Sequence, residues 1–320
     1  AVGSAAVVTP DAAPEPAVTW PTTAGLPYAR WPGATDRAAD HDLIVLAGTE
    51  LTYNPDVCDP PPPLPEGKCR MHFNALGVTA RPDGRIEWPA RTDPSRLAQV
   101  DRAVAMAHTL GTDLVQFNHP QWHWGTTPAL LVDAISHGIG LVEIANKQFA
   151  KWNGGQLAAP PTQAAFPSTE ALWDAAWLAG ATVWGVASDD AHHYQADGGG
   201  EYPAGGAYIV VHARREPLAI LDAIRAGEFY ASTGVALARV EHVSNALVVE
   251  VAADDPGEHV IRFVVDGVPA AALTGRVAAF PVPTQGSVRA VVERSDGARA
   301  WTQPVRAVSA GLAGARTAVR

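Results

Sequence analysis

The chain has 320 residues, of which 47% are hydrophobic and 18% charged, so it is long enough for one large domain and one small one. Its net charge of −10 and pI near 5.5 argue against a nucleic-acid-binding protein, because binding a phosphate backbone needs clustered Lys and Arg. The nearest approach to a basic cluster is the pair Arg214 and Arg215, and no apolar run approaches the length of a transmembrane helix.

The N-terminal segment, residues 1–40, is rich in Ala and Pro and has no clear periodicity, so we expect it to be mostly irregular. It lacks the charged start and apolar centre of a signal peptide. Its composition resembles a tether of the kind that follows a cleavage site, although a truncated gene would look similar.

Two cysteines, Cys58 and Cys69, flank the proline-rich segment DPPPPLPEGK. A stiff loop with a cysteine at each end predicts a disulfide hairpin, and disulfides persist mainly outside the cytosol. The pattern therefore favours a periplasmic or secreted protein. Two free thiols in a cytoplasmic protein are the alternative, whereas a structural zinc site needs more ligands than two cysteines supply.

Strands and helices alternate through residues 41–234, which predicts a parallel sheet or barrel with right-handed crossovers. Strands are expected at 42–47, 71–78, 113–117, 140–145, 183–188 and 207–212, and helices at 93–110, 128–136, 169–179 and 217–226.

The pattern changes after Gly234, where short strands are separated by turn signals such as Asp266-Gly267 and Asp296-Gly297. Residues 235–308 are therefore predicted to form a small all-β domain, an antiparallel sandwich, followed by a loose tail at 309–320. The expected strands are 235–243, 247–251, 260–266, 277–282, 287–293 and 300–305.

The expected strand 183–188 ends in Ser188-Asp189-Asp190-Ala191-His192, at the position where α/β folds place their chemistry. Asp190 and His192 are two residues apart, so continued strand geometry would direct both to one side. A carboxylate and an imidazole held together suit zinc, manganese or iron. The alternative is a polar loop that caps the strand.

Three further candidates lie at or near predicted strand ends, namely Glu50, His72 and His119. In a parallel barrel these ends converge, and two histidines with one carboxylate describe a catalytic metal site with an open position for water. Each residue alone also has an ordinary interpretation. Glu50 fits a solvated strand end, His72 a hydrogen-bonded core histidine, and His119, which precedes a proline, a rigid turn.

Other histidines divide into two groups by their position in the chain. His123 and His193, with Tyr194, lie close to the candidate ligands and are expected to contact substrate, and we expect Asp190, His192 and His193 to act in catalysis. A surface role is expected for the others, which are His108, His137, His212, His242 and His259.

An ordered set of motifs resembles the PHP (polymerase and histidinol phosphatase) metallohydrolases, and within them the branch of carbaryl-hydrolase-type enzymes. The motifs are GTEL at 48–51, MHFNALGV at 71–78, FNHP at 117–120, VEIAN at 142–146 and SDDAH at 188–192. FYASTGV at 229–235 and WTQPV at 301–305 resemble the β module appended to such proteins, so the resemblance spans residues 40–306.

The resemblance implies a distorted (β/α)7 barrel with a two- or three-metal centre at the C-terminal ends of its strands. It also implies which side chains bind the metals: Glu50, His72, His119, Asp190 and His192.

The chain departs from the family at its N-terminal end, where an H-x-H and then a T-D-H motif are expected. The corresponding region reads AVTWPTTAG at 17–25, and no histidine precedes His41. One metal position, that of Glu50, His72 and His119, is therefore complete, and a second one near Asp190 is expected to be weak. Either the first strands are missing from this chain, or the centre is reduced or inactive.

These observations predict a metal-dependent hydrolase that cleaves a small phosphoester or related ester with a metal-bound hydroxide. The first alternative is a catalytically impaired relative that binds a ligand in the same pocket. The second is an envelope-associated binding protein that works through its β domain, although Phe263, Phe280 and Trp301 fit core positions equally well. The sequence leaves the oligomeric state open.

Overall fold

The computed structural model describes residues 44–63, 67–80, 93–148, 167–192, 204–243 and 245–307. The chain divides into two compact units, Ala1–Gly234 and Val235–Arg320. The expected irregular segment 1–40, the tail 309–320, and His193 with Tyr194 lie outside the described residues. No helix in the described ranges is both long and apolar enough to cross a membrane.

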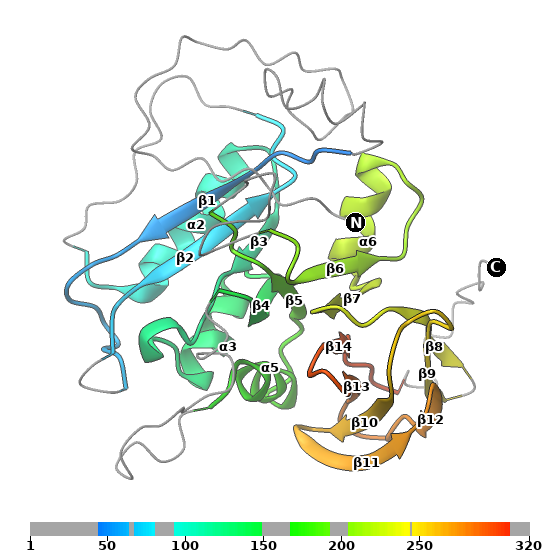
Figure 1. Ribbon diagram of the computed structural model, residues 1–320. Helices are drawn as coiled ribbons and strands as arrows, with labels where there is room; N and C mark the ends of the chain where they lie inside the picture. Colours follow the sequence, from blue (N-terminus) through cyan, green and yellow to red (C-terminus); the bar gives the residue numbers. More distant parts are fainter. Residues whose placement is uncertain are drawn as a thin grey trace. The chain divides into compact units, whose positions relative to one another are not determined.

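The first unit contains a five-stranded mixed sheet in the order β1-β2-β3-β4-β5 (Figure 1). Its strands are β1 (Gly48–Tyr53), β2 (Met71–Leu76), β3 (Leu114–Phe117), β4 (Leu141–Asn146) and β5 (Trp184–Ser188). Pairing is antiparallel for β1–β2 and β2–β3 and parallel for β3–β4 and β4–β5.

The expectation of an all-parallel sheet is therefore wrong for the first two strands, and the described residues contain no closed barrel. The segment that joins β1 to β2 accounts for part of this difference. Cys58 and Cys69 form the predicted disulfide, with their Cα atoms 5.5 Å apart. The disulfide brings the two ends of this connection close together, so β2 starts beside the end of β1. This favours an antiparallel pair rather than a crossover to a parallel strand.

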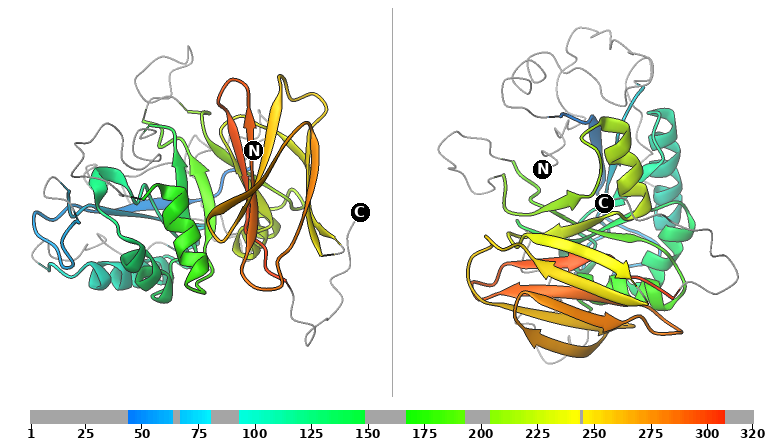
Figure 2. Two further views of the ribbon diagram at one scale, coloured as in Figure 1. Left: turned by 90° about the horizontal axis from the view of Figure 1, so that it is seen from below. Right: turned by 90° about the vertical axis from the view of Figure 1, so that its right-hand side faces the viewer.

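Helices α2 (Arg96–Thr109), α3 (Pro128–Ser136) and α5 (Thr169–Leu178) lie along one face of this sheet (Figure 2). Each begins at a hydroxyl residue that accepts a hydrogen bond from a backbone N–H of the first turn, which satisfies a donor that the helix itself leaves open. These capping residues are Ser95, Thr127 and Ser168.

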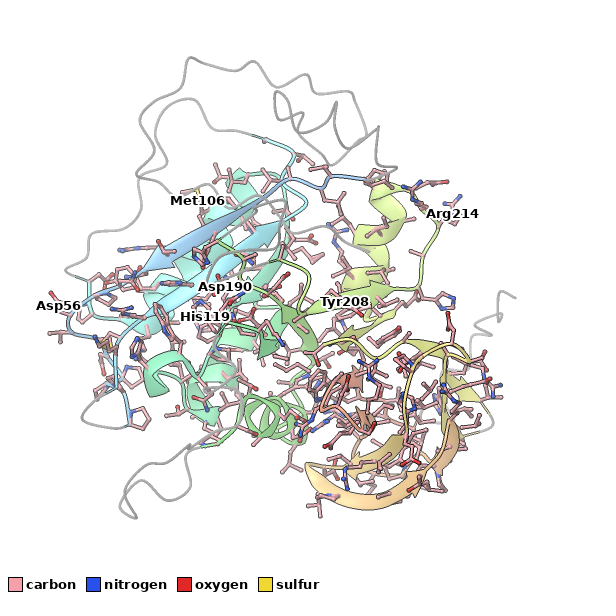
Figure 3. All side chains as sticks on the ribbon, in the orientation of Figure 1. Asp56, Met106, His119, Asp190, Tyr208 and Arg214 are labelled. Atoms are coloured by element: carbon pink, nitrogen blue, oxygen red, sulfur yellow. A yellow bond between two sulfur atoms is a disulfide. The ribbon has the colours of Figure 1, made fainter. Side chains whose placement is uncertain are left out.

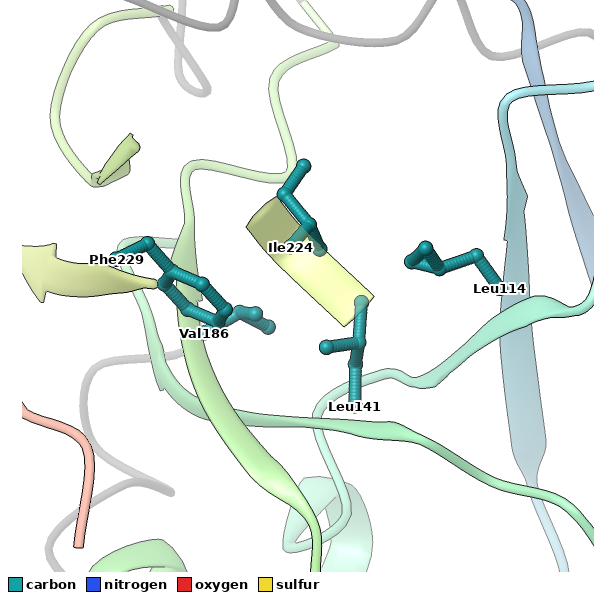
Figure 4. Packing of buried hydrophobic residues seen from close by; sticks show 5 residues of the cluster. All are labelled: Leu114, Leu141, Val186, Ile224 and Phe229. Atoms are coloured by element: carbon teal, nitrogen blue, oxygen red, sulfur yellow. The ribbon is translucent and has the colours of Figure 1, made fainter. Parts of the chain in front are cut away.

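The described elements that follow β5 in the first unit are β6 (Tyr208–Val211), α6 (Pro217–Ala226) and β7 (Phe229–Ser232), with β6 and β7 paired antiparallel. An apolar cluster packs this segment against the five-stranded sheet (Figure 4). It is formed by Leu114, Leu141, Val186, Ile224 and Phe229. Burying side chains of this size contributes about 1.5–3 kcal/mol each to folding, so the cluster fixes the position of β5, whose end carries Asp190.

The second unit is all-β, and its described strands form two antiparallel groups. The strands are β8 (Leu237–Val243), β9 (Ala246–Val251), β10 (His259–Val265), β11 (Val268–Thr274), β12 (Val277–Pro281), β13 (Val288–Arg294) and β14 (Arg299–Thr302). One group has the order β12-β9-β8 and the other β11-β10-β13-β14. Phe263 on β10 and Phe280 on β12 stack with ring centroids 5.1 Å apart, so the two groups face each other as the sandwich prediction requires.

Strand β11 has no counterpart among the predicted strands. Its sequence, VPAAALT, has no alternating hydrophobic pattern, and most of its side chains are exposed. Pro269 is tolerated because β11 lies at the edge of its group, where one row of backbone donors has no neighbouring strand.

Candidate metal centre

Glu50 lies in the middle of β1, where it pairs with Asn74 of β2. The prediction of a strand at 42–47 with Glu50 beyond its end is therefore wrong, because the strand is formed by the alternating segment GTELTY. Leu51 and Tyr53 point into the core, which turns Glu50 to the opposite face. Its Oε1 atom lies 3.2 Å from His72 Nδ1 and accepts a hydrogen bond of 3.2 Å from Asn118 Nδ2.

His72 is the second residue of β2, and its two ring nitrogens face different partners. Nε2 lies 2.9 Å from Asn54 Oδ1, and Nδ1 faces Glu50. Amide and carboxylate oxygens both accept, so either ring nitrogen can carry the proton, and a metal ion bound at Nδ1 would leave Nε2–H to donate to Asn54. Metal-binding histidines are commonly oriented by a hydrogen bond of this kind.

His119 follows β3 and completes a group of three potential ligands. Its Nε2 atom lies 4.0 Å from Glu50 Oε1, and its ring centroid is 4.9 Å from that of His72. The ligand atoms of Glu50, His72 and His119 all lie within 4.8 Å of one another. One ion bound about 2.0–2.2 Å from each of them requires only small side-chain movements.

The ionisation of this group suits a metal ion. Burial, assisted by the neighbouring His72, lowers the pKa of His119 to about 3, so the ring is neutral at pH 7 and keeps a lone pair for coordination. Burial opposes ionisation of Glu50 as well, but the bond from His72 and the nearby His119 and Asn118 outweigh it and lower the pKa of Glu50. Two imidazoles and one carboxylate form the donor set of catalytic zinc sites.

Asn118 orients the carboxylate of Glu50 through a chain of amide contacts. Its Nδ2 donates to Glu50 and, at 2.9 Å, to Asn74 Oδ1, while its Oδ1 accepts from Gln116 Nε2 at 2.9 Å. Asn118 and Gln116 are both buried. These contacts hold one ligand before any metal binds.

Trp122 forms one wall of the site. It belongs to the short 3-10 helix η1 (Trp122–Trp124), and its ring contacts those of His72 and His119 edge-on, with centroids 5.0 Å and 4.9 Å away. Its backbone N–H donates to the carbonyl of His119 at 2.8 Å. The tight turn between them places His119 at φ 26° and His123 at φ 54°, which non-glycine residues adopt at a cost of about 1–3 kcal/mol.

Glu143, which the sequence analysis did not single out, lies at the centre of this network. It is on β4, is 1% exposed, and accepts hydrogen bonds at Oε2 from the backbone N–H of His119 (2.5 Å) and from Asn146 Nδ2 (3.1 Å). Ser188 donates to its other oxygen. Burial, and then the charge of Asp190, raises the pKa of Glu143 to about 8. The signal in the sequence is a lone carboxylate within the apolar strand LVEIAN.

Asp190 lies beside the group of three ligands but does not belong to it (Figure 3). Its Oδ2 accepts from Asn146 Nδ2 at 3.2 Å, so Asn146 links it to Glu143 and thus to His119. Burial raises the pKa of Asp190, and the charge of Glu50 raises it further.

His192 remains near Asp190, with Nδ1 3.7 Å from Asp190 Oδ1 and 2.6 Å from the Asp190 carbonyl oxygen, and its side chain is 59% exposed. Strand alternation does not bring the two together, because β5 ends at Ser188 and Asp190 has φ 49°. A turn does so instead.

The histidines expected at the surface are exposed, with one exception. His108, His137, His212 and His242 are exposed, but His259 is 2% exposed, so the expectation is wrong for it. His259 Nε2 lies 2.7 Å from Asp255 Oδ1 inside the second unit.

Comparisons of the chain with models of protein families, with curated proteins and with solved structures find no match. The arrangement of the site itself is therefore the basis for assigning a function.

Proposed function

We propose that this chain is a metal-dependent hydrolase of the PHP type that cleaves phosphoesters or related esters. The observation that carries the proposal is the buried group of Glu50, His72 and His119, whose ligand atoms converge within 4.8 Å. A divalent ion such as zinc, manganese or iron bound there would lower the pKa of a coordinated water and supply a nucleophile near neutral pH. The five ordered motifs support the family assignment.

In this mechanism the described residues have separate roles. Glu50, His72 and His119 bind the ion, and Trp122 covers the two imidazoles on one side and limits access of bulk water. Asp190 is a further carboxylate beside the site, and its raised pKa suits a group that takes up and releases a proton during the reaction. Asp190 with His192 also offers a second, weaker ion position, and His193 is proposed as a neighbouring substrate contact.

The Cys58–Cys69 disulfide supports a periplasmic or secreted location for this enzyme, because such bonds persist in oxidising compartments.

An impaired, ligand-binding relative is the second candidate function. The observation that favours it is that the described residues contain a single group of three ligands that could share an ion. Phosphoester hydrolysis often relies on two ions that share the attacking and leaving oxygens. We therefore expect slow turnover of p-nitrophenyl phosphate by this chain even when a metal is supplied.

The metal content of the purified chain, measured by elemental analysis after addition of zinc or manganese, tests the proposal. We expect about one ion per chain in the unmodified protein and loss of most of it in His119→Ala. His137→Ala is the matched control, because His137 is exposed and pairs with Asp101 at the surface. A metal content that His119→Ala leaves unchanged contradicts the assignment. Metal binding without any hydrolysis of phosphate or carboxylate esters favours the second candidate.

A further inference from the structure

Arg70 lies near the metal centre, and its guanidinium has no hydrogen bond or ion pair with a described residue. By contrast, the guanidinium of Arg96 is satisfied by Cys58 Sγ and by the backbone carbonyls of Gly125 and Lys68. The Cζ atom of Arg70 lies 4.5 Å from the centroid of the Trp122 ring. The side chain is partly buried, so its position is set by packing rather than by solvent alone.

The same indole ring places Arg70 beside the metal centre. Arg70 immediately precedes β2 and is two residues before His72, a spacing that in extended chain puts both side chains on one side. Both of them contact Trp122, and so does His119. The guanidinium and the two imidazoles therefore share contacts with a single indole ring.

Stacking on Trp122 leaves the edge of the guanidinium, where its N–H donors lie, available to a ligand. A guanidinium on an aromatic face is held by the electron-rich ring without using those donors. Planar, paired N–H groups match the oxygens of phosphate and carboxylate. Arg70 therefore has the chemical properties of an anion-binding residue.

The overall negative charge of the chain opposes the binding of an anionic substrate, and a cation at the site counteracts this. A net charge of −10 repels anionic molecules at long range, and Glu50 adds a negative charge inside the site itself. A cation at the edge of the site offsets this repulsion where the substrate must bind.

We propose that Arg70 is the specificity-determining residue of this site, and that it binds an anionic oxygen group of the substrate or product beside the metal position. The proposal rests on the metal-dependent activity proposed above and narrows its substrates to molecules that carry phosphate or another oxyanion. Trp122 acts as a positioning residue for Arg70.

Titration of inorganic phosphate into the zinc-loaded chain tests this role by calorimetry. Arg70→Met retains an apolar stem against Trp122 and removes the charge, so we expect the affinity for phosphate to fall about tenfold or more. Arg70→Lys restores the charge without the paired donors and should give an intermediate affinity. Arg214→Met is the matched control, because Arg214 is exposed and pairs with Glu216 at the surface.

Zinc affinity, measured on the same samples, separates failure of this proposal from failure of the metal centre. We expect Arg70→Met to bind zinc as the unmodified chain does. If zinc binds normally and Arg70→Met binds phosphate as tightly as the unmodified chain, or if the zinc-loaded unmodified chain binds no phosphate, the role of Arg70 is wrong while the metal centre stands. If the unmodified chain binds no zinc, the proposed function fails and this proposal fails with it.

Discussion

Two buried clusters in this chain combine histidine with a carboxylate, and their different partners give them different roles. In the second unit, Asp255 contacts His259 at 2.7 Å and also accepts hydrogen bonds from Arg294 at 3.1 Å and from the backbone N–H of Ala236 at 2.7 Å. In the first unit, Glu50 contacts His72 and Asn118 and faces His119.

The presence of an arginine distinguishes the two clusters. Arg294 neutralises Asp255 and is held in turn by Asp296 at 2.8 Å, so the carboxylate of the second cluster already has a cation, although His259 Nδ1 is buried without a described hydrogen-bond partner. Glu50 has no arginine among its described partners, and the imidazoles of His72 and His119 converge on it instead. A carboxylate beside imidazoles and without a built-in cation suits a bound metal ion, whereas a carboxylate paired with arginine stabilises the fold.

The largest expected effect comes from removing Asp255 from the cluster that it forms with His259 and Arg294. Asp255→Ala leaves Arg294 without its buried partner and His259 without its acceptor, so we expect the free energy of unfolding of the second unit to fall by about 3–5 kcal/mol. Hydrogen exchange of the amides in β10 and β13 measures this loss. Asp254→Ala, at an exposed neighbouring position, should leave it unchanged.

Zinc affinity should be the same in Asp255→Ala as in the unmodified chain. A coupled loss of zinc affinity would show that the two clusters do not act separately.

A smaller effect, on zinc affinity, is expected from changing Glu143, which supports the metal centre. Glu143→Leu removes the oxygen that accepts the N–H of His119, so the turn that presents His119 loses its anchor. We expect zinc affinity to fall about 10–100-fold, as for other residues that orient a metal ligand. Competition with a chromophoric chelator measures it, and Glu228→Leu, on an exposed residue, is the control. Unchanged zinc affinity in Glu143→Leu would mean that the turn holds without this side chain.

The smallest expected effect concerns the stability of the second unit at low pH. Burial alone would raise the pKa of Asp255, but hydrogen bonds from Ala236, His259 and Arg294 outweigh it and lower the pKa. A lowered folded-state pKa means that this stabilisation is fully present above the ordinary Asp value of about 3.9 and is lost as the pH falls further.

We therefore expect the stability of the second unit to decline below about pH 4. In Asp255→Asn, which cannot titrate, the slope should be shallower by at most one proton, about 1.4 kcal/mol per pH unit. Hydrogen exchange of β10 and β13 measured from pH 3 to pH 6, after correction for the intrinsic exchange rate, gives both slopes. Equal slopes in the two proteins would show that Asp255 does not contribute to the loss of stability in acid.

Local features of the sequence predicted much of the fold. The bounds of α3 and α6 agree with the prediction, because a proline at the first turn of each and a stop signal after it are encoded within a few residues. The disulfide was predicted from two cysteines that flank a proline-rich loop, and the structure confirms it. His72 and His119 were expected as ligands from their positions near strands, and the structure brings both to Glu50.

Only the tertiary structure decided which strands pair and which buried groups support the site. The antiparallel pairing of β1, β2 and β3 depends on contacts between distant segments, which hydrophobic periodicity does not encode. Glu143 gains its role from Asn146, Ser188 and the backbone of His119, and the last two reach it from β5 and from the turn after β3. Hydrogen bonding and charge act through space, so a single carboxylate in an apolar strand acquires a function only when folding determines its neighbours.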